Sequence, residues 1–422
     1  MKILIISQLF EPLNEIGAVR PTKLAYFLCK NGYSVDVFTS SYGVNKVIDI
    51  NSKPYRLVYD RPVQLVEEQI HRTAKGIKRT NKQDGRLLKE AKKTYRQILA
   101  IKKGKMFAAD FKKAVDEGSI YLSDYDFVFS TFGPIGSTYA GIVAKRKSQT
   151  IKWISDFRDP LVSKEMPVLL LPYLRWVQNY CVKNADHVTT VSHGYKKRIE
   201  LKKLLKEVVV IPNGYDTNDF KNNVDEPSSF SFAYVGALYE GKRNLGSLFE
   251  GIKVIIDSGI VARDVIKFNY AGRDFEFLYK QAEQYGLEDI LVNHGIVSRE
   301  TSFVIQAMSR YLVLSTWNEK GEEGVFPGKL IEYMLMRKPV ISIVCGNLPS
   351  SEVTEVIHEL GLGYSYETMN PSKKQEFANW LLSEAERFRD GLQSNFRPNF
   401  EEIDKRYNWN SIVKLFEEIM NG

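Results

Sequence analysis

The feature that most constrains this chain is a series of apolar, strand-like runs alternating with amphipathic helical patterns, which begins again after residue 214. The first series contains the runs KILII, SVDVFT, DFVFST, IKWIS, HVTTV and VVVIP. The second series contains SFAYVG, VIKFNYAG, ILVNHG, YLVLS and PVISIV. Strands that alternate with helices form parallel sheets covered by helices on both faces. The sequence therefore predicts an α/β protein with two doubly wound, Rossmann-like domains.

The domain boundaries follow from the same pattern. A chain of 422 residues exceeds the usual size of one hydrophobic core. The polar stretch 218–231 follows the first series of strands and is typical of a connection between domains. We therefore place the first domain at residues 1–214 and the second at residues 215–405, and we expect a C-terminal helix at residues 406–422.

The composition excludes several classes of protein. A content of 44% hydrophobic and 26% charged residues is typical of a globular protein. No run approaches the roughly 18 consecutive apolar residues that span a bilayer, and the start MKILIIS has no charged leader, so we expect a cytoplasmic location. The three cysteines lie too far apart for a disulfide framework or a zinc site, and no pair of histidines has metal-ligand spacing. No metal site is predicted.

The net charge of +8 is concentrated in one region. Residues 67–113 contain 15 lysines and arginines and 5 acidic residues, so the remainder of the chain is slightly acidic. Apolar residues recur at helical spacing between residues 84 and 115, which predicts a basic amphipathic insertion in the first domain, near residues 67–115. Two interpretations stay open: a solvated insertion that packs on its domain, or a surface that docks on an anionic membrane. Nucleic acid is not an expected partner, because no nucleic-acid-binding motif accompanies the charge.

The segment 311–343 carries the strongest chemical signal. A buried strand is followed by a Gly-rich acidic loop, and Pro327-Gly328-Lys329 then opens a helix. Proline suits the start of a helix, glycine lets a ligand approach the backbone, and a helix N-terminus attracts anions. Lys329 adds a full positive charge, and Glu332 lies on the same helix face, where its carboxylate can accept hydrogen bonds from hydroxyl groups. A phosphate site beside a diol site is the outline of a nucleoside diphosphate.

At these residues the sequence resembles the large family four of retaining glycosyltransferases with the GT-B fold, in which two Rossmann-like domains hold a nucleotide-sugar donor in a central cleft. The resemblance implies that Glu332 binds the donor ribose and that the C-terminal helix crosses back to the first domain. The family has a second acid eight positions before this one, but here that position is Gly324. Glu322 and Glu323 lie one or two positions away, so which acid touches the sugar stays open.

The resemblance continues at the motif FAYVGALYEGKR. Family members have a strand, a glycine and then a basic residue that clamps the donor pyrophosphate, which implies this role for Lys242 or Arg243 after Gly236. The alternative for either cation is an ordinary place on the surface. Further along the chain, Gly295 and Ile296 fall where the family holds the nucleobase by main-chain groups.

The first domain carries two further candidate sites. The family has a Gly-containing loop beneath the donor phosphates after the first strand, often with an arginine at its end, which implies Gly17 and Arg20. The segment DFRDP follows a buried strand, where the family carries a residue near the reacting sugar, and this favours Asp156 as an acid that contacts the sugar or the acceptor. A structural alternative is that Asp156 and Asp159 pair with Arg158 or cap the next turn.

The resemblance implies transfer of a sugar from a nucleotide-diphosphate donor to a glycan or lipid-linked acceptor, with retention of anomeric configuration and without a metal or other cofactor. Ser192 ends a strand-like run before a helical pattern, which predicts a helix N-cap rather than a nucleophile. Alternatives on the same fold are a nucleotide-sugar 2-epimerase, a donor hydrolase and a non-catalytic nucleotide-binding scaffold. A nicotinamide dehydrogenase is disfavoured, because no G-x-G-x-x-G motif follows the first strand.

Overall fold

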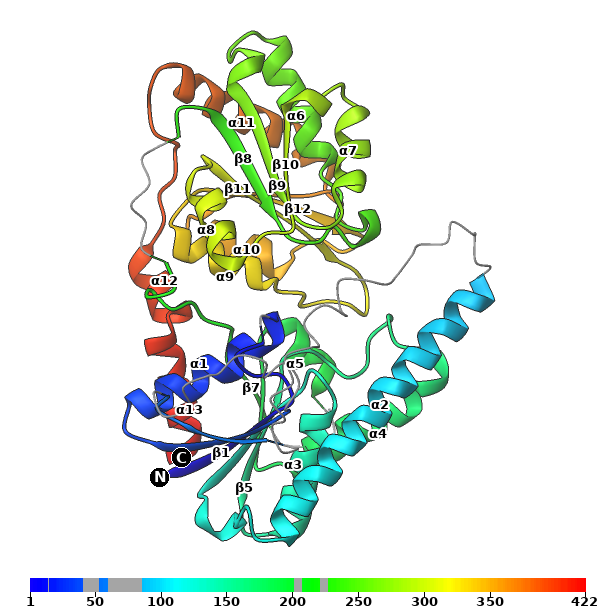
Figure 1. Ribbon diagram of the computed structural model, residues 1–422. Helices are drawn as coiled ribbons and strands as arrows, with labels where there is room; N and C mark the ends of the chain where they lie inside the picture. The colour runs from blue at the N-terminus through cyan, green and yellow to red at the C-terminus, as the bar shows by residue number, and fades with distance from the viewer. Residues whose placement is uncertain (14, 41–52, 60–85, 201–206, 221–226) are drawn as a thin grey trace. The chain divides into compact units, whose positions relative to one another are not determined.

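The computed structural model describes residues 1–13, 15–40, 53–59, 86–200, 207–220 and 227–422 (Figure 1). The chain forms two compact units: unit 1 comprises Met1–Pro212 together with Ile412–Gly422, and unit 2 comprises Asn213–Ser411. The first segment of unit 1 thus ends at Pro212, two residues before the boundary that the sequence predicts at residue 214. The last eleven residues of the chain form a second segment of the same unit.

Unit 1 is built around a seven-stranded parallel sheet in the order β3-β2-β1-β4-β5-β6-β7. The strands are β1 (Lys2–Ser7), β2 (Ser34–Thr39), β3 (Arg56–Tyr59), β4 (Phe127–Thr131), β5 (Lys152–Phe157), β6 (His187–Thr190) and β7 (Val208–Val210). The central strands β1, β4 and β5 are almost wholly buried, as their continuous apolar runs predict. The strand order reverses between β1 and β4.

The helices of unit 1 are α1 (Ile16–Lys30), α2 (Arg86–Asp116), α3 (Gly136–Lys147), α4 (Leu171–Asn184), α5 (His193–Ile199) and most of α13 (Trp409–Asn421). Ser192 caps α5, since its hydroxyl oxygen accepts a hydrogen bond from the Tyr195 N–H at 3.2 Å. This confirms the predicted N-cap. Phe416 of α13 packs edge-on against Phe129 of β4, so the end of the chain completes the core of this unit.

The predicted basic insertion forms the long helix α2 over its described part, whereas residues 67–85 lie outside the described residues. Gly104 lets α2 approach α3 closely, because a Cβ at this position would lie 2.8 Å from a side-chain carbon of Ile135 and 3.0 Å from the backbone nitrogen of Gly136. The C-terminal half of α2 therefore packs on the unit through Phe107 and Phe111, which are both buried.

Unit 2 contains a six-stranded parallel sheet in the order β10-β9-β8-β11-β12-β13. The strands are β8 (Phe230–Val235), β9 (Ile266–Ala271), β10 (Leu291–Gly295), β11 (Tyr311–Asn318), β12 (Val340–Gly346) and β13 (Gly363–Glu367). The helices are α6 (Gly246–Asp257), α7 (Phe275–Glu283), α8 (Arg299–Ala307), α9 (Gly328–Met336), α10 (Glu352–Glu359), α11 (Lys374–Arg389) and α12 (Phe400–Tyr407). Here the strand order reverses between β8 and β11.

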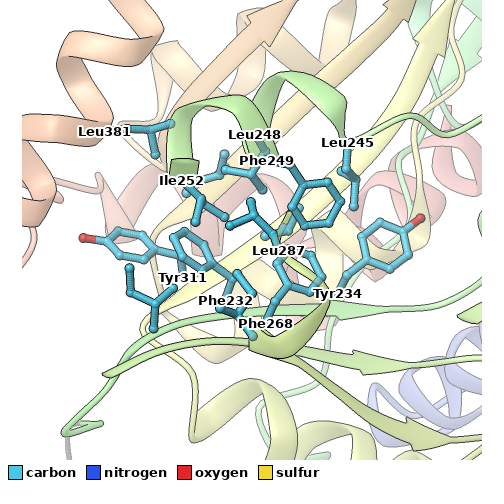
Figure 2. Packing of buried hydrophobic residues seen from close by; sticks show 14 of the residues in the cluster. Phe232, Tyr234, Leu245, Leu248, Phe249, Ile252, Phe268, Leu287, Tyr311 and Leu381 are labelled. Carbon is cyan, nitrogen blue, oxygen red and sulfur yellow. The ribbon is translucent and has the colours of Figure 1, made fainter. Parts of the chain in front are cut away.

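One aromatic core holds α6 and α11 against a face of this sheet (Figure 2). Phe232 stacks on both Phe268 and Tyr311, with ring centroids 6.2 and 5.5 Å away. Fully burying such a side chain stabilises a fold by about 1.5–3 kcal/mol. Gly251 of α6 leaves the room that Leu381 of α11 occupies, because a Cβ there would lie only 2.4 Å from a methyl carbon of Leu381.

In the described part of the chain, none of the helices combines the length and the apolar character that a bilayer-spanning segment needs. The described residues also contain no cluster of three or more histidine, cysteine or acidic side chains suited to a metal ion. Cys29, Cys181 and Cys345 are free thiols.

Candidate nucleotide-sugar site

In parallel α/β sheets, ligands bind outside the carboxyl ends of the strands, at the point where the strand order reverses. In unit 2 this point lies between β8 and β11, so the loops that follow these two strands flank it. The loop after β8 carries Gly236, Lys242 and Arg243, and the loop after β11 leads to Gly328 and Lys329 at the start of α9. The topology therefore brings the predicted clamp and the predicted anion site to one edge of one sheet.

Gly236 ends β8 in a conformation that favours glycine, with φ of +139°. Its N–H donates to the carbonyl of Ala271 at 2.8 Å, and its own carbonyl accepts from the Tyr270 hydroxyl at 3.1 Å. A Cβ at Gly236 would meet no described atom within 4 Å. The backbone at this strand end is fixed by its neighbours yet open on the side where a side chain would stand.

Lys242 is held over an indole ring beside a carboxylate. Its Nζ lies 3.9 Å from the centroid of the Trp317 ring and donates to the Glu322 carboxylate at 3.0 Å. The Trp317 indole N–H donates to the same oxygen of Glu322 at 3.1 Å. The Glu322 side chain is 6% exposed and that of Lys242 is 30% exposed. Of the acids near the predicted sugar contact, Glu322 is thus engaged with the clamp.

Arg243 stands next to Lys242 with its guanidinium 4.6 Å from the Tyr239 ring centroid. One of its terminal N–H groups donates to the carbonyl of Ala237 at 3.1 Å and to the Tyr234 hydroxyl at 3.3 Å. Burial raises the pKa of Tyr234 to about 12, although the charge of Arg243 opposes the rise. Among the described residues, the buried Nε of Arg243 has no hydrogen-bond partner.

The start of α9 combines a helix N-terminus with two side chains of opposite charge. Pro327 occupies the N-cap position and offers no side-chain cap to the first N–H groups of the helix. The Lys329 ammonium donates to the Glu332 carboxylate at 2.6 Å, as the spacing of three residues predicts. The side chains are 26% and 13% exposed respectively. Both charged groups are thus ordered by each other and partly accessible.

Gly295 and Ile296 lie at the end of β10, which is the edge strand, two strands away from β8. Gly295 has φ of +66°, and a Cβ there would meet no described atom within 4 Å. Ile296 is 82% exposed. Since neighbouring strands lie about 4.8 Å apart, these main-chain groups stand roughly 10 Å from the end of β8, on the same edge of the sheet.

Unit 1 has its own reversal point, between β1 and β4, and Arg158 lies there. A Cβ at Gly17, after β1, would lie 2.9 Å from one terminal nitrogen of Arg158, and a Cβ at Gly133, after β4, would lie 2.3 Å from the other. Arg158 also approaches the Asp159 carboxylate at 3.4 Å, with its own side chain 17% exposed. Gly17 therefore makes room for Arg158. From the sequence, Arg158 was expected only to pair with Asp156 and Asp159.

Arg20 and Asp156 are placed in the interior of unit 1. The guanidinium donates to both carboxylate oxygens of Asp156 at 3.1 and 2.9 Å, and to the carbonyls of Ile211 and Pro212 at 3.0 and 2.9 Å. Thr131 and Thr189 each donate a hydroxyl hydrogen bond to Asp156 at 2.7 Å. The Asp156 side chain has no exposed surface and that of Arg20 is 2% exposed.

This placement argues against the predicted contacts of Arg20 with the donor and of Asp156 with the sugar or acceptor. Both groups already have charged or polar partners and neither reaches the surface of the described structure. The alternative interpretation was that Asp156 and Asp159 both pair with Arg158. Asp156 instead pairs with Arg20, and only Asp159 lies beside Arg158.

The chain contains one Asp-x-Asp triplet, Asp124-Tyr125-Asp126, a pattern that can hold a metal ion in glycosyltransferases. The expectation of metal-free transfer overlooked this triplet. It precedes β4 and so lies at the amino ends of the strands, on the edge opposite to the reversal point. Asp126 accepts a hydrogen bond from the backbone N–H of Lys2 at 2.7 Å. Within unit 1, the triplet therefore lies at the opposite edge of the sheet from Gly17 and Arg158.

Trp317 and Arg158 belong to the candidate site but were not predicted from the sequence. A tryptophan near the end of an apolar strand is usually a core residue, so nothing in the sequence singled out Trp317 as the platform for Lys242. Arg158 stood between two acids, where local pairing was the simpler interpretation, and only the strand order shows that two loops distant in sequence leave space for it.

No family model matches the chain, and a search of curated proteins finds no relative of significant sequence similarity. Solved structures do match. The apo form of the lipopolysaccharide outer core galactosyltransferase WaaB aligns with a TM-score of 0.57 and 17% identity, over 100% of this chain and 99% of that chain. The N-terminal domain of trehalose-6-phosphate phosphatase from Candida albicans aligns with a TM-score of 0.63 and 11% identity, over 100% and 96%.

The UDP-GlcNAc 2-epimerase from Methanocaldococcus jannaschii aligns with a TM-score of 0.53 and 12% identity, over 100% of both chains. Proteins of different activity thus share this architecture with the chain, and at such low identity the likeness concerns the fold alone. Together with the two parallel sheets and their reversal points, these similarities show that the chain has the two-domain, Rossmann-like GT-B fold.

Proposed function

We propose that this protein is a glycosyltransferase, which moves a sugar from a nucleotide-diphosphate donor to a glycan or lipid-linked acceptor in the synthesis of a cell-surface polysaccharide. One observation carries the proposal. Three cations follow the two strands that flank the strand-order reversal of unit 2: Lys242 and Arg243 lie on the loop after β8, and Lys329 lies in the first turn of α9, after β11. This is where the fold binds ligands, and a diphosphate is the ligand that such a set of charges fits.

In this proposal Lys329 and the N-terminus of α9 hold the donor diphosphate, and Glu332 accepts hydrogen bonds from the ribose hydroxyls. An ammonium group has three donors, so Lys329 can keep its 2.6 Å contact with Glu332 and still bind a phosphate oxygen. Gly295 and Ile296 then offer main-chain groups to the nucleobase from the same edge of the sheet.

Lys242 and Arg243 neutralise the charge that develops on the leaving diphosphate. Stabilising this charge with preorganised cations is the largest contribution available to the chain's own residues. Trp317 and Glu322 hold Lys242 in one position before the donor arrives, which lowers the cost of ordering it. We propose that the transfer retains the anomeric configuration, needs no metal ion and takes place in the cytoplasm.

Arg158 is the candidate contact on the side of unit 1. It lies at the reversal point of that sheet and has a glycine after each flanking strand, Gly17 in the first turn of α1 and Gly133 after β4. A planar guanidinium binds a phosphate or carboxylate in two-point fashion, so an acidic group on the acceptor is the ligand class that fits.

A thermal-shift screen against UDP-, GDP- and other activated sugars is the first test. We expect one nucleotide class to raise the melting temperature of the native chain and to lose this effect when Lys329 is replaced by alanine. Product analysis with the stabilising donor then decides between the candidates. Sugar appearing on an added acceptor supports the proposal, whereas an epimerised donor or free sugar without acceptor would replace it by epimerisation or hydrolysis.

A second candidate is a nucleotide-binding scaffold without transferase activity. It is favoured by Gly324, which stands where the resemblance calls for an acid, and by the engagement of Glu322 with Lys242. Tight donor binding with no turnover in the presence of glycan and lipid acceptors would select this candidate.

A further inference from the structure

Helix α2 has two apolar faces, and the described residues bury one of them. Ile101, Phe107, Ala108 and Phe111 are buried against unit 1. On the opposite side, Leu88, Tyr95, Leu99 and Met106 are 48%, 63%, 37% and 43% exposed. These four residues are spaced by 7, 4 and 7 positions, which at about 100° per residue places them within roughly 20° of one line along the helix.

This exposed apolar line runs through a strongly positive surface. Helix α2 contains ten lysines and arginines and three acidic residues. Lys92, Lys102 and Lys103 are exposed and lie within about 60° of the apolar line on the helix. A helix with lysines beside aromatic and aliphatic side chains has the pattern of segments that lie in the plane of a membrane interface.

The surface extends from α2 onto α4, which runs beside it in Figure 1. The Lys105 ammonium lies 5.5 Å from the Tyr173 ring centroid of α4, and Tyr173 stacks with Trp176 at 6.3 Å. Trp176 is 56% exposed, and Leu169, just before α4, is 83% exposed. Large apolar side chains at such exposure, gathered beside lysines, mark an interaction site.

Charge selects the partner. A second copy of the chain would bring α2, with its net charge of +7, against an identical helix, and the two would repel. Nucleic acid would attract the lysines but would leave Leu99, Met106 and Leu169 without an apolar environment. An anionic lipid bilayer satisfies both features, because its headgroups attract lysines and its interfacial region accepts tryptophan, tyrosine and leucine.

We propose that the exposed face of α2, together with the start of α4, docks unit 1 onto a bilayer that contains anionic lipid. The proposal depends on the surface of unit 1 alone and goes beyond the chemistry proposed for unit 2. A lipid-linked acceptor would then be met at the surface on which the enzyme sits.

The first test is co-sedimentation of the full chain with phosphatidylcholine vesicles, with and without phosphatidylglycerol. We expect binding only to the anionic vesicles, and a loss at high salt. The triple variant K92Q/K102Q/K103Q should bind on the order of a hundredfold more weakly, because each lysine near such a surface contributes about fivefold. The matched control K267Q/K280Q/K405Q removes the same charge from exposed positions of unit 2 and should bind nearly as the native chain does.

The apolar part of the surface has a separate test. Trp176 should show a blue-shifted emission on binding to anionic vesicles, and W176F should lack this change. The variant Y95S/L99S should bind at least several-fold more weakly, while M308S, at an exposed apolar residue of unit 2, should have no effect. Equal binding to neutral vesicles, or native binding by both α2 variants, would overturn the proposal.

One control separates these outcomes from the proposed chemistry. Donor-induced thermal stabilisation should be unchanged in the α2 variants, since the nucleotide site lies in unit 2. If the native chain ignores vesicles but forms a dimer or binds RNA through the same lysines, the surface belongs to that partner and the membrane proposal is wrong, whatever the fate of the transferase activity.

Discussion

Two kinds of cation–carboxylate pair lie near the carboxyl ends of the strands, one kind in each unit, and they differ in their surroundings. The pair of Arg20 and Asp156 in unit 1 has almost no exposed side-chain surface, and its remaining donors and acceptors bind threonine hydroxyls and backbone carbonyls. The pairs Lys242–Glu322 and Lys329–Glu332 in unit 2 keep their lysines about a quarter to a third exposed. The first pair is closed to ligands and the others are not.

The difference shows that residue type and position at a strand end do not reveal whether a charged residue stabilises the fold or binds a ligand. A buried pair is costly to break, because removal of one partner leaves the other charge without compensation. A partly exposed pair contributes little to stability but can exchange a partner for a ligand. Stability and activity should therefore respond in opposite ways in the two units.

The largest expected effect is on the stability of unit 1. Arg20→Ala should lower the free energy of unfolding by about 3–5 kcal/mol, because the Asp156 carboxylate is left buried without its cation. Urea denaturation followed by circular dichroism measures the loss. Arg175→Ala, at an exposed position of α4, is the control and should stay within about 0.5 kcal/mol of the native chain. A stable Arg20→Ala protein that has lost only activity would reverse our assignment.

The next effect is on catalysis by unit 2. Lys329→Ala should lower kcat/KM by about 10²–10³-fold, which corresponds to roughly 3–4 kcal/mol of transition-state stabilisation, while the melting temperature stays near the native value. Steady-state transfer with the donor found by thermal shift provides the measurement. Lys253→Ala, on the exposed side of α6, should have native kinetics. Unchanged turnover in Lys329→Ala would reject the anion site at α9.

An intermediate pair sharpens the comparison. Asp36 in β2 is 5% exposed, and Arg56, which is 56% exposed, donates to it at 2.6 and 2.9 Å. Burial acts to raise the pKa of Asp36, but hydrogen bonds from Arg56 and Tyr125 outweigh it and lower this pKa below its ordinary value. Asp36→Asn should cost about 1–3 kcal/mol of stability at neutral pH, between the values for the buried and the exposed pairs.

The pH dependence of this cost has a definite sign. Because the pKa of Asp36 is lower in the folded state, its contribution is fully present above the unfolded value of about 3.9 and is lost as the pH falls through the folded value. The stability difference between the native chain and Asp36→Asn should therefore shrink in acid. A difference that stays constant from neutral pH to below pH 3 or so would show that the charge of Asp36 is not its source.

The smallest effect is expected where a carboxylate acts through a lysine. Glu322→Gln keeps the shape of the side chain but weakens its hold on Lys242, so we expect kcat/KM to fall by about tenfold, or roughly 1.4 kcal/mol. Lys242→Ala should fall further, and the double variant should match Lys242→Ala because both changes affect one interaction. Additive losses would mean that Glu322 has a role of its own, such as contact with the sugar.

The fold was largely predictable because its signals are periodic and local. Apolar runs of strand length, the restart after residue 214 and the serine before α5 each point to one structure, and the structure contains them. The direction of a single side chain is not a local signal. Asp156 lies in register between Thr131 and Thr189 on the neighbouring strands, and only this pairing shows that its carboxylate is enclosed.

The place of the candidate site follows from the sequence more readily for unit 2 than for unit 1. The order of Gly236, Lys242, Lys329 and Glu332 along the chain is enough to suggest a diphosphate site, since strands in a parallel sheet present their carboxyl ends at one edge. In unit 1 the corresponding cation is Arg158, which follows the fifth strand and reaches back to the loops after β1 and β4. No motif in the sequence indicates that the Arg158 side chain lies beside Gly17 and Gly133.

The return of α13 to unit 1 has a consequence for how the protein is made. Ile412, Val413 and Phe416 are buried, and the Phe416 ring packs on Phe129 and beneath the guanidinium of Arg20. A ribosome makes these residues only after it has made unit 2, so the part of unit 1 that is synthesised first lacks them until then. The core of unit 1 is therefore completed only after unit 2 has been synthesised, and a premature stop near residue 411 would destabilise the part of the chain that was translated earliest.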